Sequence, residues 1–157
     1  GVLIDVSNMY HSAKNLFGKK ANFQEILKQA VAGRKLIRAT AYVIKTEKEE
    51  EFPFFEALSQ QGFEVKMKDL QIFAGGAKKA NWDIGIAIDA IKLASKLDVI
   101  VLVSGDGDFL PLMSYLQNNK GCLVEVMAFG KTTSSKLVEE SDDFIDLGKD
   151  KKFLISK

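Results

Sequence analysis

Short apolar segments alternate with amphipathic segments along most of this chain, and this alternation constrains the fold more than any other feature. The segment Asp98–Val103 (DVIVLV) is apolar on both faces, which is typical of a central strand in a parallel sheet. Strands that alternate with helices indicate that each strand connects to the next through a helix packed on the sheet. We therefore predict a doubly wound α/β fold in which all or most strands are parallel.

The same reasoning assigns the other elements. Further strands are predicted at Val2–Val6, Leu36–Ile44, Phe63–Met67, Leu123–Phe129 and Phe144–Leu147. Helices are predicted at Asn22–Ala32, Glu49–Gln60, Trp82–Lys96, Phe109–Gln117 and Ser134–Glu140. The helix at Trp82–Lys96 places Ile84, Ile88 and Ile91 on one face, together with Ala94 or Ser95. The segment Asp69–Asn81, which contains two glycines and two lysines, is predicted to be a mobile loop.

Length and composition limit the kind of protein. The 157 residues are enough for one domain, which we place at residues 1–147, followed by a lysine-rich tail at 148–157. A single cysteine, Cys122, excludes an internal disulfide framework. The net charge of +1 gives no general reason to expect nucleic acid or a membrane surface. No apolar run approaches the length of a membrane span, and no leader is visible, so we expect a cytoplasmic protein without a membrane partner.

Four aspartates are predicted to converge at one edge of the sheet. Asp5 lies near the end of the first strand, Asp106 and Asp108 directly follow Asp98–Val103, and Asp83 opens a helix. Ligands bind beyond the carboxyl ends of the strands in such sheets. Clustered carboxylates repel one another unless a cation neutralises them or some remain protonated. Oxygen-only clusters suit Mg²⁺ or Mn²⁺, which support in-line hydrolysis of a phosphodiester.

Each of these residues also has an ordinary structural interpretation. Asp83 is suited to be a helix N-cap, and Asp106-Gly107-Asp108 is suited to a turn followed by a cap. Asp5 is harder to explain in this way, because a charge inside an apolar strand is costly to bury. Their expected convergence is what favours a functional site.

Neighbouring polar residues are candidates for supporting roles. Asn8 either caps the segment after the first strand or orients Asp5, and Ser104 is placed to do the same from the central strand. Asp89 lies about 240° around the helix from Asp83, so we expect it to support the site or to pair structurally. His11 is one helical turn from Asn8 and is more often a surface residue than part of a site.

Three segments together resemble the NYN domain family, the LabA-like branch of the PIN-domain superfamily. They are the first strand with Asp5 and Asn8, the helix segment Asp83–Ala90, and Val101–Leu112 with its SGDGDF sequence. The resemblance covers about residues 1–147. It implies a PIN-like three-layer α/β/α sandwich around a parallel sheet of about five strands. It also implies a metal-dependent ribonuclease with Asp5, Asp83, Asp106 and Asp108 as catalytic and metal-binding positions, and it matches Asn8 and Asp89 as well.

One departure from the family concerns the residues before the helix, where this chain has Ala80-Asn81-Trp82-Asp83 in place of Lys-Gly-Val-Asp. Trp82 either stacks on an RNA base or packs on the sheet. RNA binding has to come from local charge. The first candidates are Lys78 and Lys79 before Asp83, with Lys66 and Lys68 leading into the same loop, and a solvated loop explains these lysines equally well. The second candidates are Lys131 and Thr132, which follow the strand Leu123–Phe129.

The leading hypothesis is an endoribonuclease dependent on Mg²⁺ or Mn²⁺ that acts on single-stranded or exposed RNA. The alternative is a catalytically weak RNA- or protein-binding regulatory module on the same fold. A phosphatase or phosphoacceptor domain fits less well, since the first strand lacks the Asp-x-Asp-x-[Thr/Val] pattern. The sequence leaves a homodimer open.

Overall fold

The computed structural model describes residues 1–46, 51–72, 74–75 and 78–156, without the side chains of residues 71, 72, 78 and 79. Its centre is a six-stranded sheet whose neighbouring strands are all parallel, in the order β4-β3-β1-β7-β8-β9. The strands are β1 Val2–Asp5, β3 Ala39–Lys45, β4 Glu64–Asp69, β7 Val99–Val103, β8 Leu123–Ala128 and β9 Asp143–Asp146. The predicted α/β class with a parallel sheet is confirmed, and the sheet has six strands where about five were expected.

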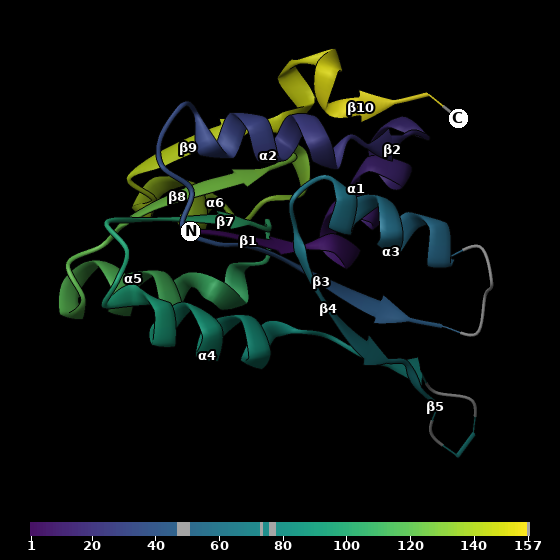
Figure 1. The fold of residues 1–157 in the computed structure, drawn as a ribbon, viewed down its shortest axis with the longest axis horizontal. Coiled ribbons are helices and arrows are strands. Elements are labelled where there is room, and N and C mark those ends of the chain that lie inside the picture. Colours follow the sequence, from purple (N-terminus) through teal and green to yellow (C-terminus); the bar gives the residue numbers. More distant parts are fainter. Residues whose placement is uncertain (47–50, 73, 76–77, 157) are drawn as a thin grey trace.

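Helices cover both faces of this sheet (Figure 1). One layer holds α1 Val6–Phe17, α2 Phe23–Val31 and α3 Glu51–Gln60, and the other holds α4 Asp83–Ala94, α5 Leu110–Asn119 and α6 Ser135–Glu140. Short 3-10 helices follow several strands, namely η1 Gly107–Phe109, η2 Gly130–Thr132, η3 Leu147–Lys149 and η4 Lys151–Phe153. Within the described ranges, no helix is long and apolar enough to cross a membrane.

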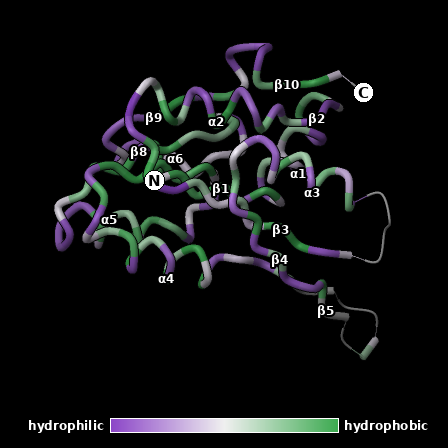
Figure 2. The backbone as a smooth tube through the Cα atoms, in the orientation of Figure 1, coloured by the Kyte–Doolittle hydropathy of each residue, from purple (hydrophilic) through white to green (hydrophobic). Residues whose placement is uncertain are grey.

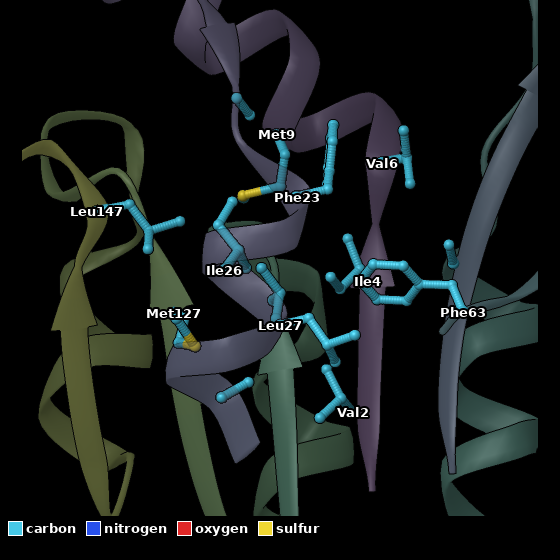
Figure 3. Packing of buried hydrophobic residues seen from close by; sticks show 14 of the residues in the cluster. Val2, Ile4, Val6, Met9, Phe23, Ile26, Leu27, Phe63, Met127 and Leu147 are labelled. Carbon is cyan, nitrogen blue, oxygen red and sulfur yellow. The ribbon is translucent and has the colours of Figure 1, made fainter. Parts of the chain in front are cut away.

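The two cores follow from the alternation of side chains along each strand. Val2 and Ile4 of β1 face α1 and α2 and pack with Met9 and Ile26, as Figure 3 shows, while Leu3 faces α4 and α5. The central strands are therefore apolar on both faces, which is visible as green tube through the middle of Figure 2. A strand of this kind holds a charge only where it ends, and β1 ends at Asp5.

The helix α1 begins directly at the end of β1, without an intervening loop. Asp5 is its N-cap, and its carboxylate accepts a hydrogen bond from the backbone N–H of Asn8. The helix ends at Gly18, whose φ of 63° is left-handed and suits glycine. No helix was predicted between the first strand and Asn22, and the structure has one of 12 residues here.

The helix α4 turns a different face to the sheet from the one its isoleucine spacing suggests. Ile86, Ala90 and Ala94 are buried against the sheet, while Ile84 is 75% exposed and Ile88 47% exposed. The helix is apolar nearly all round, so spacing alone does not identify its buried side.

Two segments that appeared irregular in sequence have regular structure. In the stretch predicted as a mobile loop, β5 Gln71–Ile72 pairs with β6 Lys78–Lys79 in an antiparallel hairpin. At the end of the chain, β10 Leu154–Ile155 pairs with β2 Lys20–Ala21, and Phe153 is buried in the core beside α2. The described part of the lysine-rich segment, residues 148–156, is thus held against the rest of the fold.

Candidate metal centre

A polar cleft lies where the strand order reverses direction. The chain passes from β1 to β3 and β4 on one side, then returns to β7, which pairs with β1 on the other side. The carboxyl ends of β1 and β7 therefore border a switch point, the usual ligand position in such sheets. The cleft has a volume of about 480 Å³ and is lined by Asp5, Ser7, Asn8, His11, Ser12, Asn15, Ile44, Ala80, Asn81, Asp83, Asp106, Asp108 and Thr132.

Asp5 is the buried carboxylate of this cleft. Only 8% of the residue is exposed, and burial raises the pKa of Asp5 above its ordinary value. Its partners are the N–H of Asn8 at 3.3 Å and the hydroxyl of Ser104 at 3.4 Å. The charge of nearby Asp106 adds to the upward shift of this pKa.

Ser104 and Asn8 fix the backbone that follows β7. The Ser104 hydroxyl donates to Asp5 and accepts from the N–H of Asp106 at 3.3 Å. The side-chain oxygen of Asn8 accepts from the N–H of Gly105 at 3.1 Å. These two residues therefore join the end of β1 to the loop that carries Asp106.

Asp83, Asp106 and Asp108 form the acidic trio at the mouth of the cleft. Each offers a carboxylate oxygen, and these oxygens all lie within 4.8 Å of one another. Asp106 also accepts a hydrogen bond from the N–H of Asp108 at 2.9 Å, so the expected turn chemistry is present together with the cluster. The N-cap of α4 is Trp82, not Asp83, and makes no side-chain capping bond. The carboxylate of Asp83 therefore has no capping role at this helix start.

Burial and repulsion from the neighbouring carboxylates both act on the pKa of Asp83. Partial burial and the charges of Asp106 and Asp5 raise the pKa of Asp83 to about 6. A hydrogen bond shared with Asp106 and the charge of Asp108 act in the same direction. A divalent cation relieves such repulsion because it neutralises several carboxylates at once.

The glycines of the SGDGD loop permit close packing against residues 132–134. A Cβ at Gly105 would lie 2.8 Å from the Thr133 hydroxyl and 3.2 Å from the Thr133 Cα. A Cβ at Gly107 would lie 3.0 Å from the side chain of Ser134. The N–H of Ser134 also donates to the carbonyl of Gly105, so the position of the trio depends on this contact.

The exposed side of α1 forms one wall of the cleft. Asn8, His11 and Asn15 lie at helical spacing along it and all line the cleft. The wall is tied to η2 by the hydroxyls of Ser12 and Thr132, 3.2 Å apart. His11, which the sequence favoured as a surface residue, is thus exposed but within the site. The missed helix explains the difference, since its period places His11 beside Asn8.

Asp89 does not line the cleft. Its carboxylate accepts hydrogen bonds from the Tyr42 hydroxyl and the Lys66 ammonium, both at 2.8 Å. Partial burial acts to raise the pKa of Asp89, but these two hydrogen bonds act in the opposite direction and the pKa is lowered. The structural-partner interpretation of Asp89 therefore fits the geometry, and Asp89 links α4 to β3 and β4.

Trp82 contacts residues of the sheet. Its indole N–H donates to the carbonyl of Val43 at 2.8 Å, and its ring packs against Tyr42. The Lys68 ammonium lies over the ring, 4.5 Å from its centroid. These contacts are those of the sheet-packing alternative, in which Trp82 lies between α4 and the sheet.

The other predicted RNA contacts are placed unevenly. Thr132 lines the cleft, and Lys131 beside it is exposed. Lys78 and Lys79 form β6, but their side chains lie outside the described part of the chain. Lys66 and Lys68 are engaged with Asp89 and Trp82 respectively.

The chain is similar to known proteins in sequence and in fold. The chain is 27% identical to the "Low amplitude and bright protein LabA" of Synechococcus elongatus, over 98% of this chain and 86% of that protein. It is similar in structure to a protein of unknown function from Vibrio parahaemolyticus, with a TM-score of 0.90 and 32% identity. That match covers 98% of this chain and 94% of the other. The NYN domain model matches residues 1–148, and the chain therefore belongs to the NYN domain family.

Proposed function

We propose that this protein is a metal-dependent ribonuclease that hydrolyses RNA phosphodiester bonds in the cleft between β1 and β7. The observation that carries the proposal is the acidic trio, whose three carboxylates from two distant chain segments approach within 4.8 Å at an open polar cleft. Membership of the NYN family supports the same class of activity.

The donor set fits a hard divalent cation. Carboxylate oxygens with open solvent positions beside them are the ligands that Mg²⁺ and Mn²⁺ accept most readily. Asp83, Asp106 and Asp108 would hold the ion, with the buried Asp5 beside them as a fourth acidic group. The raised pKa of Asp83 supports this fit, because the site is strained by its own charge until a cation binds.

Side chains of the protein would position the carboxylates and bind the phosphates of the RNA. When bound, a divalent cation would polarise a phosphoryl oxygen and lower the pKa of a water molecule. Asn8 and Ser104 hold the SGDGD loop against β1 and so set the spacing of the carboxylates. Thr132 lines the cleft and Lys131 is its exposed neighbour in sequence, so a hydroxyl and an ammonium are available to bind the phosphates beside the bond that is cut.

The test is cleavage of a labelled single-stranded RNA with Mn²⁺, Mg²⁺ or EDTA, by the wild type and by Asp106→Asn. We expect metal-dependent cleavage that falls at least 100-fold in the variant, since a ligand and its charge are lost. Asp98→Asn is a matched control, because Asp98 is exposed just before β7, at the opposite edge of the sheet. Cleavage that persists in EDTA or in Asp106→Asn would contradict the proposal. RNA that is bound but never cut would favour the regulatory module.

A further inference from the structure

Outside the acidic cleft, lysines occur in two segments with few acids, residues 6–24 and 147–156, and at Lys131. Residues 6–24 contain no acidic residue and three lysines, and residues 147–156 contain three lysines and one aspartate. This distribution is hidden by the net charge of +1. We call the following set the basic track: Lys14, Lys19, Lys20, Lys131, Lys149, Lys151 and Lys152.

The segments of the basic track are neighbours around the far end of α1. Lys20 in β2 is paired with Ile155 in β10, and η2, η3 and η4 pack against one another in that order. The hydrogen bond between Ser12 and Thr132 joins α1 to η2. Figure 1 shows β2 and β10 side by side beyond α1, on the side to which the strands of the sheet point. The lysines therefore continue from the cleft without crossing an acidic region of α1.

Most ammonium groups of the basic track are not neutralised. Among the described residues, Lys152 is the one member with an ion pair, 3.9 Å from Asp150. Asp146, an acid beside these segments, accepts hydrogen bonds from the backbone N–H groups of Gly130 and Gly148 at 2.9 Å each. All members are exposed except the half-buried Lys19. A surface with this surplus of exposed charge attracts a polyanion.

We propose that the basic track binds the phosphates of an RNA strand that extends out of the cleft along α1. This inference rests on the proposed function, because the cleft supplies the starting point of the strand. Continuity favours RNA over an acidic protein: Asn15 lines the cleft one residue beyond Lys14, and Thr132 does so one residue beyond Lys131. A nearby cationic surface also offsets the repulsion between the acidic trio and a polyanion.

The proposal gives a measurable dependence on salt. For a single strand, the slope of log K against log salt is about −0.7 for each phosphate neutralised. Removing three contacts therefore reduces the slope by about 2. Between 50 and 200 mM salt, wild-type affinity should fall about 20-fold more than that of a variant lacking three contacts.

The experiment compares Lys20→Glu/Lys149→Glu/Lys151→Glu with Lys35→Glu/Lys92→Glu/Lys96→Glu, which makes the same charge change at exposed positions elsewhere. Fluorescein-labelled oligouridines of 4 and 16 nucleotides are titrated in EDTA, so that no strand is cut. Circular dichroism and the unfolding midpoint establish that both variants fold. We expect the first variant to bind the 16-mer at least tenfold more weakly, with the reduced salt slope, and the second to bind it like the wild type.

Four results would be informative. Loss of 16-mer binding in the track variant, without loss of 4-mer binding, supports the proposal. Equal binding by both variants overturns the basic track while leaving the nuclease proposal intact. Tighter binding of polyglutamate than of RNA by the wild type would assign the track to an acidic protein and overturn the inference. If metal-dependent cleavage and all RNA binding are absent, the proposed function fails and this inference fails with it.

Discussion

Replacing Asp83 by asparagine should stabilise the metal-free protein while removing its activity. The pKa of Asp83 is raised from 3.8 to about 6, so the folded protein binds this proton more tightly than the unfolded chain does. Stability attributable to Asp83 is therefore present below about pH 4 and is lost as the pH rises through 6. Asparagine keeps the size of the side chain and carries no charge, so Asp83→Asn should not lose stability as the pH rises through 6.

The magnitude follows from the shift and from the solvent exposure of the group. A change in pKa from 3.8 to about 6 corresponds to roughly 3 kcal/mol if it is fully expressed. We halve this to about 1.5 kcal/mol because the carboxylate is half-exposed and screened by water. An acid in the first turn of α4 also gains about 0.5 kcal/mol from the helix dipole, which asparagine forfeits. The net gain is about 1 kcal/mol at pH 7.5 and close to zero at pH 4.

Urea unfolding in EDTA measures this difference. With a slope of about 2 kcal/mol per molar urea, the Asp83→Asn midpoint should lie about 0.5 M higher at pH 7.5. Added Mn²⁺ should stabilise the wild type but not the variant, since the ion binds only the folded wild-type site.

Asp89→Asn on the same helix is the matched control, with the opposite sign. The pKa of Asp89 is lowered, so its charge contributes stability above about pH 4 that is lost as the pH falls. We expect this variant to be about 1 kcal/mol less stable at pH 7.5. The reasoning is refuted if Asp83→Asn is destabilised at pH 7.5 in EDTA, or if its gain persists at pH 4.

Two further predictions concern packing. Gly105→Ala should cost about 1–3 kcal/mol in unfolding free energy, because the new methyl group meets Thr133. The substitution should also reduce metal-dependent cleavage, because it moves Asp106. An unchanged melting temperature would show that the contact is not tight. Phe153→Ala should cost about 3–5 kcal/mol by thermal unfolding, because Phe153 is only 3% exposed, whereas a loose C-terminal segment would leave the midpoint unchanged.

The placement of Asp5 and Asp106 at one edge of the sheet could be predicted from the sequence, because the carboxyl ends of parallel strands lie at the same edge. Asp5 and Asp106 follow apolar strands, so both had to reach the same edge. The structure places Asp83 beside Asp106, as expected, and the order of the helices and strands follows the predicted alternation.

Not every feature of the site was predicted. In α1, the buried residues Val6, Met9 and Ala13 lie at helical spacing, so the sequence does carry a signal for this helix and for the cleft wall with His11. Other features depend on tertiary contacts. The packing of Trp82 is decided by a carbonyl on β3 that is distant in sequence. Both faces of α4 are apolar. Ala90 and Ala94 lie next to the sheet, because their small side chains allow the helix to approach it closely.

The hydrogen bond between Ser104 and Asp5 joins residues 99 positions apart, which makes the site a late product of folding. Asp5 is synthesised before β3, β4 and α4, whereas Ser104 and Asp106 are synthesised only after them. A nascent or partly unfolded chain therefore holds at most scattered carboxylates. Any cleavage activity of this domain therefore requires that the two halves of its sheet have met.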